Sequence, residues 1–246
     1  MTRPRSVRAR AALALAGAAA ADALAVVLPV ACAGCGRADR SVCADCLVAL
    51  EPAPFPTERP GVHAWAAFAY TGPPARVIGA YKDGGRTDAA RPLASALRAA
   101  IGAALAAALA ETPGGADAPI ELCTVPSTPQ SRRARGYSPV NRLLEVAGLR
   151  SAGVLGFTRE HADQAALDAD ARRANARGSL AARHPLEGRR FLLVDDVLTT
   201  GATLAEASRA VLEGGGRIVG AAVLADTPRR LAGPRIGPIG PDHSTS

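Results

Sequence analysis

Aromatic residues are scarce in this chain of 246 residues, since phenylalanine, tryptophan and tyrosine together make up 3% of it. The core must therefore consist mainly of alanine, valine and leucine, and an apolar content of 48% is ample for one α/β domain with a small appendage. The net charge of +7 favours anionic ligands, yet the arginines are scattered and no stripe combines them with aromatic rings. The composition therefore does not support a dedicated nucleic-acid-binding domain.

Lysine is almost absent from the sequence. Of the 29 basic residues one is a lysine, Lys82, and the other 28 are arginines. An ammonium group is a compact point charge and a guanidinium is a planar fork, so the two cations do not replace each other at a point-charge site. Lys82 precedes the corner Asp83-Gly84-Gly85, which ends a helix predicted to start at residue 76. We therefore treat Lys82 as a candidate functional residue, with chance as the alternative explanation.

Four of the five cysteines form two C-x-x-C pairs with seven residues between them. Four thiolates in a short loop suit tetrahedral Zn²⁺, and a site closed by four sulfurs leaves no position for a substrate, so we predict a structural zinc site. Disulfides are the alternative, and export would favour them. The fifth cysteine, Cys123, lies in an apolar strand and is predicted to be an inert core residue. The predicted zinc ligands are Cys32, Cys35, Cys43 and Cys46.

The segment 1–28 begins with arginines and continues through alanines and leucines, a pattern that secretory signals share. Asp22 interrupts the apolar run, and alanine is too weakly hydrophobic to drive insertion as leucine does. We therefore predict an alanine-rich N-terminal helix, no membrane span and a cytoplasmic protein. The prolines between residues 51 and 60 predict an extended linker. The Pro- and Gly-rich segment 231–246 predicts a disordered tail.

The stretch 190–212 predicts a strand, a loop and a helix, because an apolar run is followed by two acids, threonines with one glycine, and a helical pattern. Unpaired backbone N–H groups gather in such a loop at the positive end of the helix dipole, which is a phosphate-binding arrangement. Asp195 and Asp196 are in reach of sugar hydroxyls or a hydrated Mg²⁺. A buried strand with a capping turn is the alternative, but two adjacent acids repel unless a cation or a polyhydroxylated ligand separates them.

A second candidate anion site follows the strand predicted at 120–125, where a tight loop carries Arg132, Arg133 and Arg135. A solvated basic turn is the alternative. Further along the chain, residues 158–185 are polar and cationic with few apolar anchors, which is typical of a mobile lid over a site. An ordinary surface helix is the alternative for that segment.

The stretch 192–203 resembles the phosphoribosyl-pyrophosphate (PRPP) signature of type I phosphoribosyltransferases. With the paired cysteines and the Val-Pro start of the basic loop, the chain resembles the ComF/GntX family, the competence protein F-like phosphoribosyltransferases. The resemblance implies an α/β fold with an open, mainly parallel sheet flanked by helices over residues 61–230. It also implies a small N-terminal zinc module with four cysteine ligands at residues 29–50.

The resemblance further implies site residues. The two acids would bind the ribose, the threonine loop its 5′-phosphate, and the basic loop and the lid the pyrophosphate; a lysine followed by glycine recurs in the family at the place of Lys82. Where the family has Phe-Asn-Gln, this chain has Tyr137-Ser138-Pro139, with Asn141 as a candidate replacement for the amide. The further cysteine pair that family members often carry is missing here. The implied PRPP-binding residues are Asp195, Asp196, Thr199, Thr200, Gly201, Ala202, Thr203, Val125, Pro126, Ser127, Arg132, Arg135, Gly136 and Arg172.

These features predict an enzyme that transfers the phosphoribosyl group from Mg-PRPP to a base or amine and releases pyrophosphate. Asp195, Asp196 and Lys82 are the predicted catalytic residues, Mg²⁺ comes with the substrate, and Zn²⁺ is structural. The sequence shows no general base and does not identify the acceptor. The alternative function is a non-catalytic PRPP sensor or docking protein linked to DNA uptake, with a competence or DNA-processing protein as its partner. Whether the chain forms a homodimer stays open.

Overall fold

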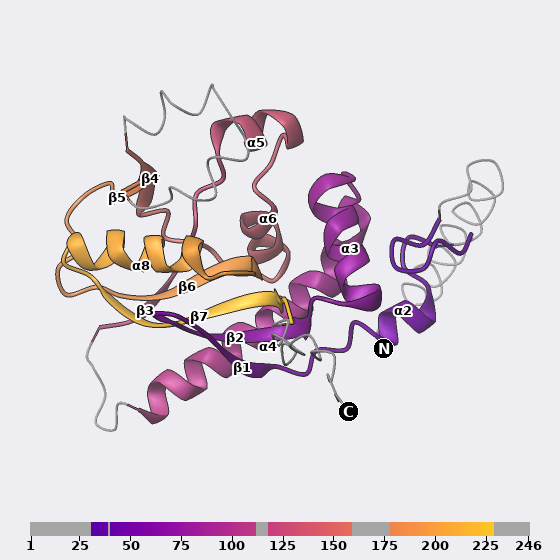
Figure 1. Cartoon of the computed structure of the whole chain (residues 1–246), viewed down its shortest axis with the longest axis horizontal. Helices are drawn as coiled ribbons and strands as arrows, with labels where there is room; N and C mark the ends of the chain where they lie inside the picture. Colours follow the sequence, from indigo (N-terminus) through magenta and orange to yellow (C-terminus); the bar gives the residue numbers. More distant parts are fainter. Residues whose placement is uncertain (1–30, 39, 112–117, 159–177, 229–246) are drawn as a thin grey trace, which may run out of the picture.

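The computed structural model describes residues 31–38, 40–111, 118–158 and 178–228. Its main sheet contains five strands: β1 (Phe55–Arg59), β2 (Val62–Ala69), β3 (Ile120–Thr124), β6 (Arg190–Leu198) and β7 (Arg217–Asp226). Their order across the sheet is β1-β2-β7-β6-β3 (Figure 1). Strands β2, β7, β6 and β3 run parallel, and β1 pairs antiparallel with β2 at one edge. This arrangement confirms the predicted α/β class with a mainly parallel sheet.

Helices cover both faces of the sheet. The helices of the described residues are α2 (Ala44–Val48), α3 (Gly72–Asp83), the 3-10 turn η1 (Thr87–Ala89), α4 (Ala90–Ala110), α5 (Pro129–Arg135), α6 (Pro139–Val146) and α8 (Ala202–Glu213). On β6, Leu192 and Val194 join the core made with α3, α4 and α6, whereas Phe191 and Leu193 join the core made with α8. Figure 1 accordingly shows α4 and α8 on opposite sides of the sheet. The continuous apolar run of β6 is thus explained by burial on both faces.

A second sheet pairs β4 (Leu155–Phe157) antiparallel with β5 (Leu180–Ala182). Leu155 and Leu180 pack into the same core as α8. The lid predicted at residues 158–185 is wrong in its last part, because this range contains β5, and Leu180 is buried there. Residues 159–177, with the predicted anion ligand Arg172, lie outside the described residues. The structure therefore fixes where this segment joins the fold, beside α8.

Among the described residues, one helix, spanning 87–110, is long and apolar enough to cross a membrane by length and composition. Its apolar side chains Leu93, Leu97 and Ile101 are buried in the core with the sheet and α6. The helix therefore has the packing of a core helix, and alanines let it lie close to the sheet.

The linker predicted at residues 51–60 is wrong in part, because this segment contains strand β1. Pro56 is tolerated there because β1 is an edge strand, in which a missing N–H need not break the sheet. Residues Phe55–Arg59, which precede the domain start predicted at residue 61, thus belong to the main sheet. The strand predicted at 120–125 is β3, which lies at the other edge of the sheet.

Residues 31–50 form a small module with α2 at one end of the molecule, next to α3 (Figure 1). The helix predicted at 1–28 and the tail predicted at 231–246 lie outside the described residues. Cys123 is fully buried in β3, and burial raises the pKa of its thiol to about 12. This environment agrees with the prediction of an inert core cysteine.

Candidate functional site

The two acids of the motif lie toward the carboxyl end of β6, directly after its fully buried part. Asp195 Oδ1 accepts a hydrogen bond of 2.9 Å from the backbone N–H of Asp196, and Asp196 Oδ1 accepts one of 2.7 Å from Val197. Burial, with a smaller contribution from the charge of Asp196, raises the pKa of Asp195 to about 7. This environment disfavours a negative charge on both acids at once. A ligand that brings hydroxyl donors or a cation would reduce the repulsion between the two carboxylates.

Lys82 supplies a cation to this pair. Its Nζ lies 2.8 Å from Asp196 Oδ2, and both side chains are largely buried, with 26% and 18% of their surface exposed. Burial lowers the pKa of Lys82, but the attraction of Asp196 outweighs it and the pKa is raised. The structure thus joins the only lysine of the sequence to one of the two motif acids, although the two residues lie far apart along the chain.

The threonine loop turns into α8 at Gly201. Gly201 has a φ of +83°, in the left-handed region that favours glycine, and caps the helix. Ala202 N–H donates to Thr200 Oγ1 over 3.3 Å. Thr199, Thr200 and Thr203 are exposed, and the first N–H groups of a helix have no acceptor within the helix itself. Phosphate binding by this loop stays a prediction, and its basis is the position of the loop at the N-terminus of α8.

Arg59 of β1 holds this loop in place, a role that sequence reasoning missed. Its Nε donates to the carbonyl of Thr199 over 2.6 Å, and its Nη2 lies 2.5 Å from Asp226 Oδ1 at the end of β7. Side-chain carbon atoms of Arg59 also pack against Gly201, where an added Cβ would lie 2.7 Å from Arg59 Cβ. No sequence signal marks this residue, because it lies in the proline-rich segment predicted to be a linker.

The basic loop after β3 is a short helix, α5, and not the predicted turn. Thr128 caps it by accepting from Ser131 N–H, and Gly136 ends it with a φ of +75°. Arg132 is exposed, but Arg135 Nη2 lies 2.8 Å from Asp83 Oδ1. At the start of this loop Val125, Pro126 and Ser127 are half-buried; Ser127 Oγ donates to Ser138 Oγ over 3.2 Å.

Tyr137 and Tyr81 join this loop to the helix that carries Lys82. Tyr137 Oη donates to the carbonyl of Tyr81 over 2.7 Å, and Tyr81 Oη donates to the carbonyl of Pro139 over 3.0 Å. The residue that replaces the family's phenylalanine is thus a hydrogen-bond donor to α3. Asn141, the candidate replacement for the amide, accepts from Thr124 Oγ1 at the end of β3 over 2.8 Å.

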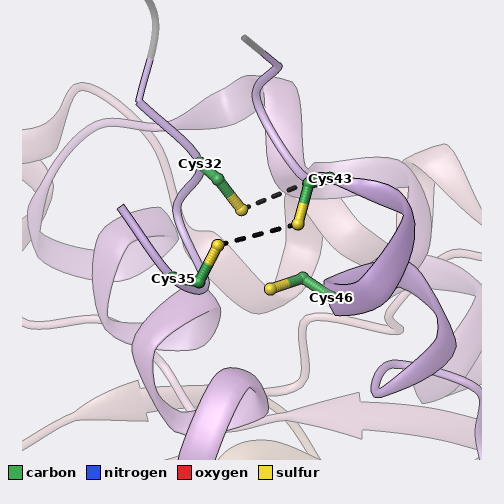
Figure 2. A group of neighbouring side chains, drawn as sticks. All are labelled: Cys32, Cys35, Cys43 and Cys46. Atoms are coloured by element: carbon green, nitrogen blue, oxygen red, sulfur yellow. Dashed lines mark hydrogen bonds between the residues drawn. The ribbon is translucent and has the colours of Figure 1, made fainter. Parts of the chain in front are cut away.

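The four cysteines of the N-terminal module face one another, as Figure 2 shows. All four sulfur atoms lie within 4.8 Å of one another, and Cys35 Sγ lies 3.6 Å from Cys43 Sγ. Tetrahedral zinc with Zn–S bonds of ~2.3 Å requires sulfurs roughly 3.8 Å apart, so this donor set fits Zn²⁺. All four are free thiols in the structure, and so is Cys123. The structure therefore supports the predicted metal site rather than disulfides.

Backbone N–H groups support this cluster. Cys32 Sγ accepts from Gly34 N–H over 3.4 Å and from Cys43 N–H over 3.3 Å. Burial raises the pKa of Cys32, but these hydrogen bonds outweigh it and lower the pKa to about 6. Burial raises the pKa of Cys46 to about 12. The protein alone therefore favours the thiolate of Cys32 over the thiol, and the thiolate is the form that binds a metal.

The sequence was also compared with known proteins. Residues 135–240 match the model of the family described as phosphoribosyl transferase domain. Over this range the chain is similar to a phosphoribosyl transferase domain. The matched region includes β6, both motif acids and the threonine loop, whereas Lys82 and the cysteine cluster precede it.

Curated relatives are similar to part of the chain. DNA utilization protein YhgH of Escherichia coli O157:H7 is 31% identical over 112 residues, which is 43% of this chain and 48% of that protein. The proteins of the same name from Escherichia coli K12 and Shigella flexneri are 30% identical with the same coverage. The matched part spans about half the length of these relatives. Together with the domain match, this similarity supports the resemblance to ComF-type phosphoribosyltransferase-like proteins.

Proposed function

We propose that this protein is a cytoplasmic phosphoribosyltransferase that binds Mg-PRPP and transfers its phosphoribosyl group to a base or amine, with release of pyrophosphate. The observation that carries the proposal is that three groups lie together at the carboxyl end of strand β6. These are the motif acids on β6, the ammonium of Lys82 2.8 Å from Asp196, and the glycine-capped start of α8. Open α/β sheets bind their ligands at the carboxyl ends of their parallel strands.

Each part of PRPP has a proposed partner in the protein. The 5′-phosphate binds the N–H groups and hydroxyls of the 199–203 loop, because the helix dipole favours an anion there. The ribose hydroxyls donate to the carboxylates of Asp195 and Asp196. Lys82, Arg132 and the lid arginine Arg172 bind the pyrophosphate, with Val125–Gly136 as its loop; the substrate's Mg²⁺ neutralises part of the same charge.

The chemistry follows from this placement. Breaking the bond between the ribose and the pyrophosphate leaves positive charge on the sugar and negative charge on the leaving group. Carboxylates beside the ribose stabilise the first charge, and Lys82 and the arginines stabilise the second, because preorganised charges act most strongly where charge develops. Closure of the lid predicted in the range 158–185 would exclude water, which otherwise hydrolyses PRPP. The acceptor is not specified by the described residues.

Pyrophosphate release tests the proposal. Purified protein, Mg-PRPP and a panel of bases and amines should yield pyrophosphate with at least one acceptor. The double variant Asp195→Asn with Asp196→Asn should lose most of this turnover. Asp45→Asn, which changes an exposed acid in the cysteine module, is the matched control and should keep the wild-type rate. Wild-type protein that binds PRPP but yields no pyrophosphate with any acceptor contradicts transfer.

A second function is favoured by the comparisons. Because the curated relatives are named DNA utilization proteins, we also propose a non-catalytic role in which PRPP binding regulates docking to a DNA-processing partner. Binding of PRPP without turnover, together with single-stranded DNA binding that persists at high salt, would favour this role, because purely phosphate-driven contacts weaken steeply with salt. Sedimentation with and without PRPP would show whether a homodimer forms.

The cytoplasmic assignment is a proposal from the sequence of segment 1–28. It predicts that the protein in cell extracts begins at residue 1. A mature protein that begins near Cys32 would contradict it and would favour export.

A further inference from the structure

Two arginines bind the backbone of the cysteine module, and they lie on either side of Lys82 in the sequence. Arg76, on α3, donates from Nε to the carbonyl of Gly34, between Cys32 and Cys35. Arg86, just after α3, donates from Nη1 to the carbonyl of Ala31 over 2.9 Å and from Nη2 to that of Ser41 over 3.2 Å. The carbonyls that they bind lie next to or between the metal-ligating cysteines.

The contacts of Arg86 reach the end of the helix that carries Lys82. Its backbone N–H donates to the carbonyl of Ala80 over 3.1 Å, and Gly84 N–H donates to the same carbonyl over 3.0 Å. Asp88 fixes the orientation of the guanidinium, with Oδ2 2.9 Å from Nη2. Arg86 thus closes the last turn of α3 with its backbone while its side chain holds the cysteine module.

Packing joins the same two parts. A Cβ added to Gly34 would lie 2.6 Å from Cys46 Sγ and 3.3 Å from Cγ2 of Val77, so the backbone of the cysteine loop rests directly on α3. Cys32, Cys43 and Cys46 belong to the same buried cluster as Val77, Ile78 and Tyr81. One face of α3 therefore packs on the cysteine module, and Lys82 extends from this helix to Asp196.

We propose that the metal-loaded cysteine module is a support that positions Lys82 for the pyrophosphate of PRPP, with Arg86 as the positioning residue that links the two. This inference rests on the proposed function. A module of about twenty residues has too little core to keep its shape without a metal. Without that shape, the carbonyls that anchor Arg76 and Arg86 shift, and the ammonium loses its fixed place.

Calorimetry with two ligands tests this inference. Arg86→Ala should weaken binding of Mg-PRPP ~10-fold, as expected for one displaced charged contact. It should leave binding of ribose 5-phosphate unchanged, because that ligand has no pyrophosphate. Arg37→Ala is the matched control: Arg37 belongs to the cysteine module and pairs with exposed Asp45, so both affinities should stay as in the wild type. An equal loss for both ligands would show general damage and overturn the inference.

A double-variant cycle separates positioning from stability. In a Lys82→Met background, Arg86→Ala should cause no further loss of PRPP affinity, since it acts through the ammonium. Additive losses would overturn the inference. Zinc removal by a chelator gives an independent test: metal-free protein that stays folded by circular dichroism should show the same selective loss of PRPP affinity. It should regain that affinity when Zn²⁺ is added back.

Two further controls keep the outcomes distinct. If Arg86→Ala does not fold, Arg76→Ala and the metal-free protein must show the selective loss, and their failure to do so overturns the inference. If wild-type protein binds neither PRPP nor ribose 5-phosphate, the proposed function itself fails. If the wild type binds both and Lys82→Met weakens PRPP alone, normal PRPP binding by the metal-free protein refutes only the support role.

Discussion

The ammonium of Lys82 on α3 lies 2.8 Å from Oδ2 of Asp196 on β6, and this ion pair joins two elements that are far apart in the sequence. Neither element alone would make the proposed site for a phosphorylated sugar. The acids without a cation would repel each other, and the lysine without the acids would be half-buried with no partner charge. In the proposed complex with PRPP, the same ammonium would be close enough to the acids to meet a leaving group that departs from a ribose bound there.

Replacement of Lys82 tests the role of its charge. Lys82→Met should weaken Mg-PRPP binding ~10-fold, because one charged contact with the pyrophosphate is lost. Lys82→Arg should not restore wild-type turnover, because the planar guanidinium does not fit the place of a compact ammonium. Arg98→Lys, at a distant contact between α4 and the carbonyl of Ala147, is the control and should behave as wild type. Wild-type kinetics in Lys82→Arg would contradict the assignment of Lys82 as a residue whose compact ammonium is required.

Asp195 should make the protein less stable as the pH rises. In the folded protein its pKa is about 7, against 3.8 for an ordinary aspartate, so the folded state binds more protons between these values. Stability from this group is therefore present at low pH and is lost as the pH rises through this window. Asp195→Asn should thus stabilise the free protein at pH 8, on the order of 2 kcal/mol, and hardly at all at pH 4. Urea unfolding of both proteins at the two pH values measures this, and a pH-independent difference would contradict it.

Alanine substitutions at Gly201 and Gly61 distinguish the cost of backbone strain from the cost of a steric clash. Both have positive φ, +83° and +71°, but an added Cβ meets Arg59 at 2.7 Å at Gly201 and nothing within 4 Å at Gly61. Gly61→Ala should therefore cost about 1 kcal/mol of unfolding free energy from backbone strain alone. Gly201→Ala should cost about 1–3 kcal/mol more, because Arg59 must move off the loop. Equal losses in urea unfolding would show that Arg59 does not hold the loop.

Glu206 should be a stabilising residue of α8, and Glu213 its matched control. Glu206 is buried, accepts from Leu180 N–H over 2.9 Å and lies 2.7 Å from Arg209, which also pairs with exposed Glu213. Burial raises the pKa of Glu206, but these hydrogen bonds, led by that from Arg209, lower it overall, so its contribution is lost as the pH falls through the lowered pKa.

Glu206→Gln should therefore destabilise the protein by about 1–3 kcal/mol at pH 7, and Glu213→Gln by less than about 0.5 kcal/mol. Thermal unfolding at pH 7 compares the two variants. If both lose the same amount, the buried pair does not anchor β5 to α8.

The sequence was most informative where the chemistry narrows the choice of residues. An apolar run before two acids predicted strand β6, although β6 continues past the acids to Leu198, and a glycine before a helical pattern predicted the start of α8. The rarity of lysine pointed to Lys82 before its partner was known. The spacing of the four cysteines predicted a cluster whose sulfurs do converge.

The sequence is least informative about residues whose hydrogen-bond or ion-pair partners lie far away along the chain. Arg59 lies among prolines that normally mark a linker, and only the pairing of β1 with β2 brings it to Thr199. Arg135 was expected to bind an anion, but it is paired with Asp83, whose proximity depends on the packing of α3 against α5. The role of Tyr137 was hidden for the same reason, since its acceptor is a backbone carbonyl.

Titration of the protein with Mg-PRPP in a calorimeter tests the central claim most directly. The account predicts saturable binding at one site per chain, competition by ribose 5-phosphate, and loss of both when Asp195 and Asp196 are changed to asparagine. A flat titration with Mg-PRPP, ribose 5-phosphate and nucleotides, from protein that is folded and zinc-loaded, would contradict it.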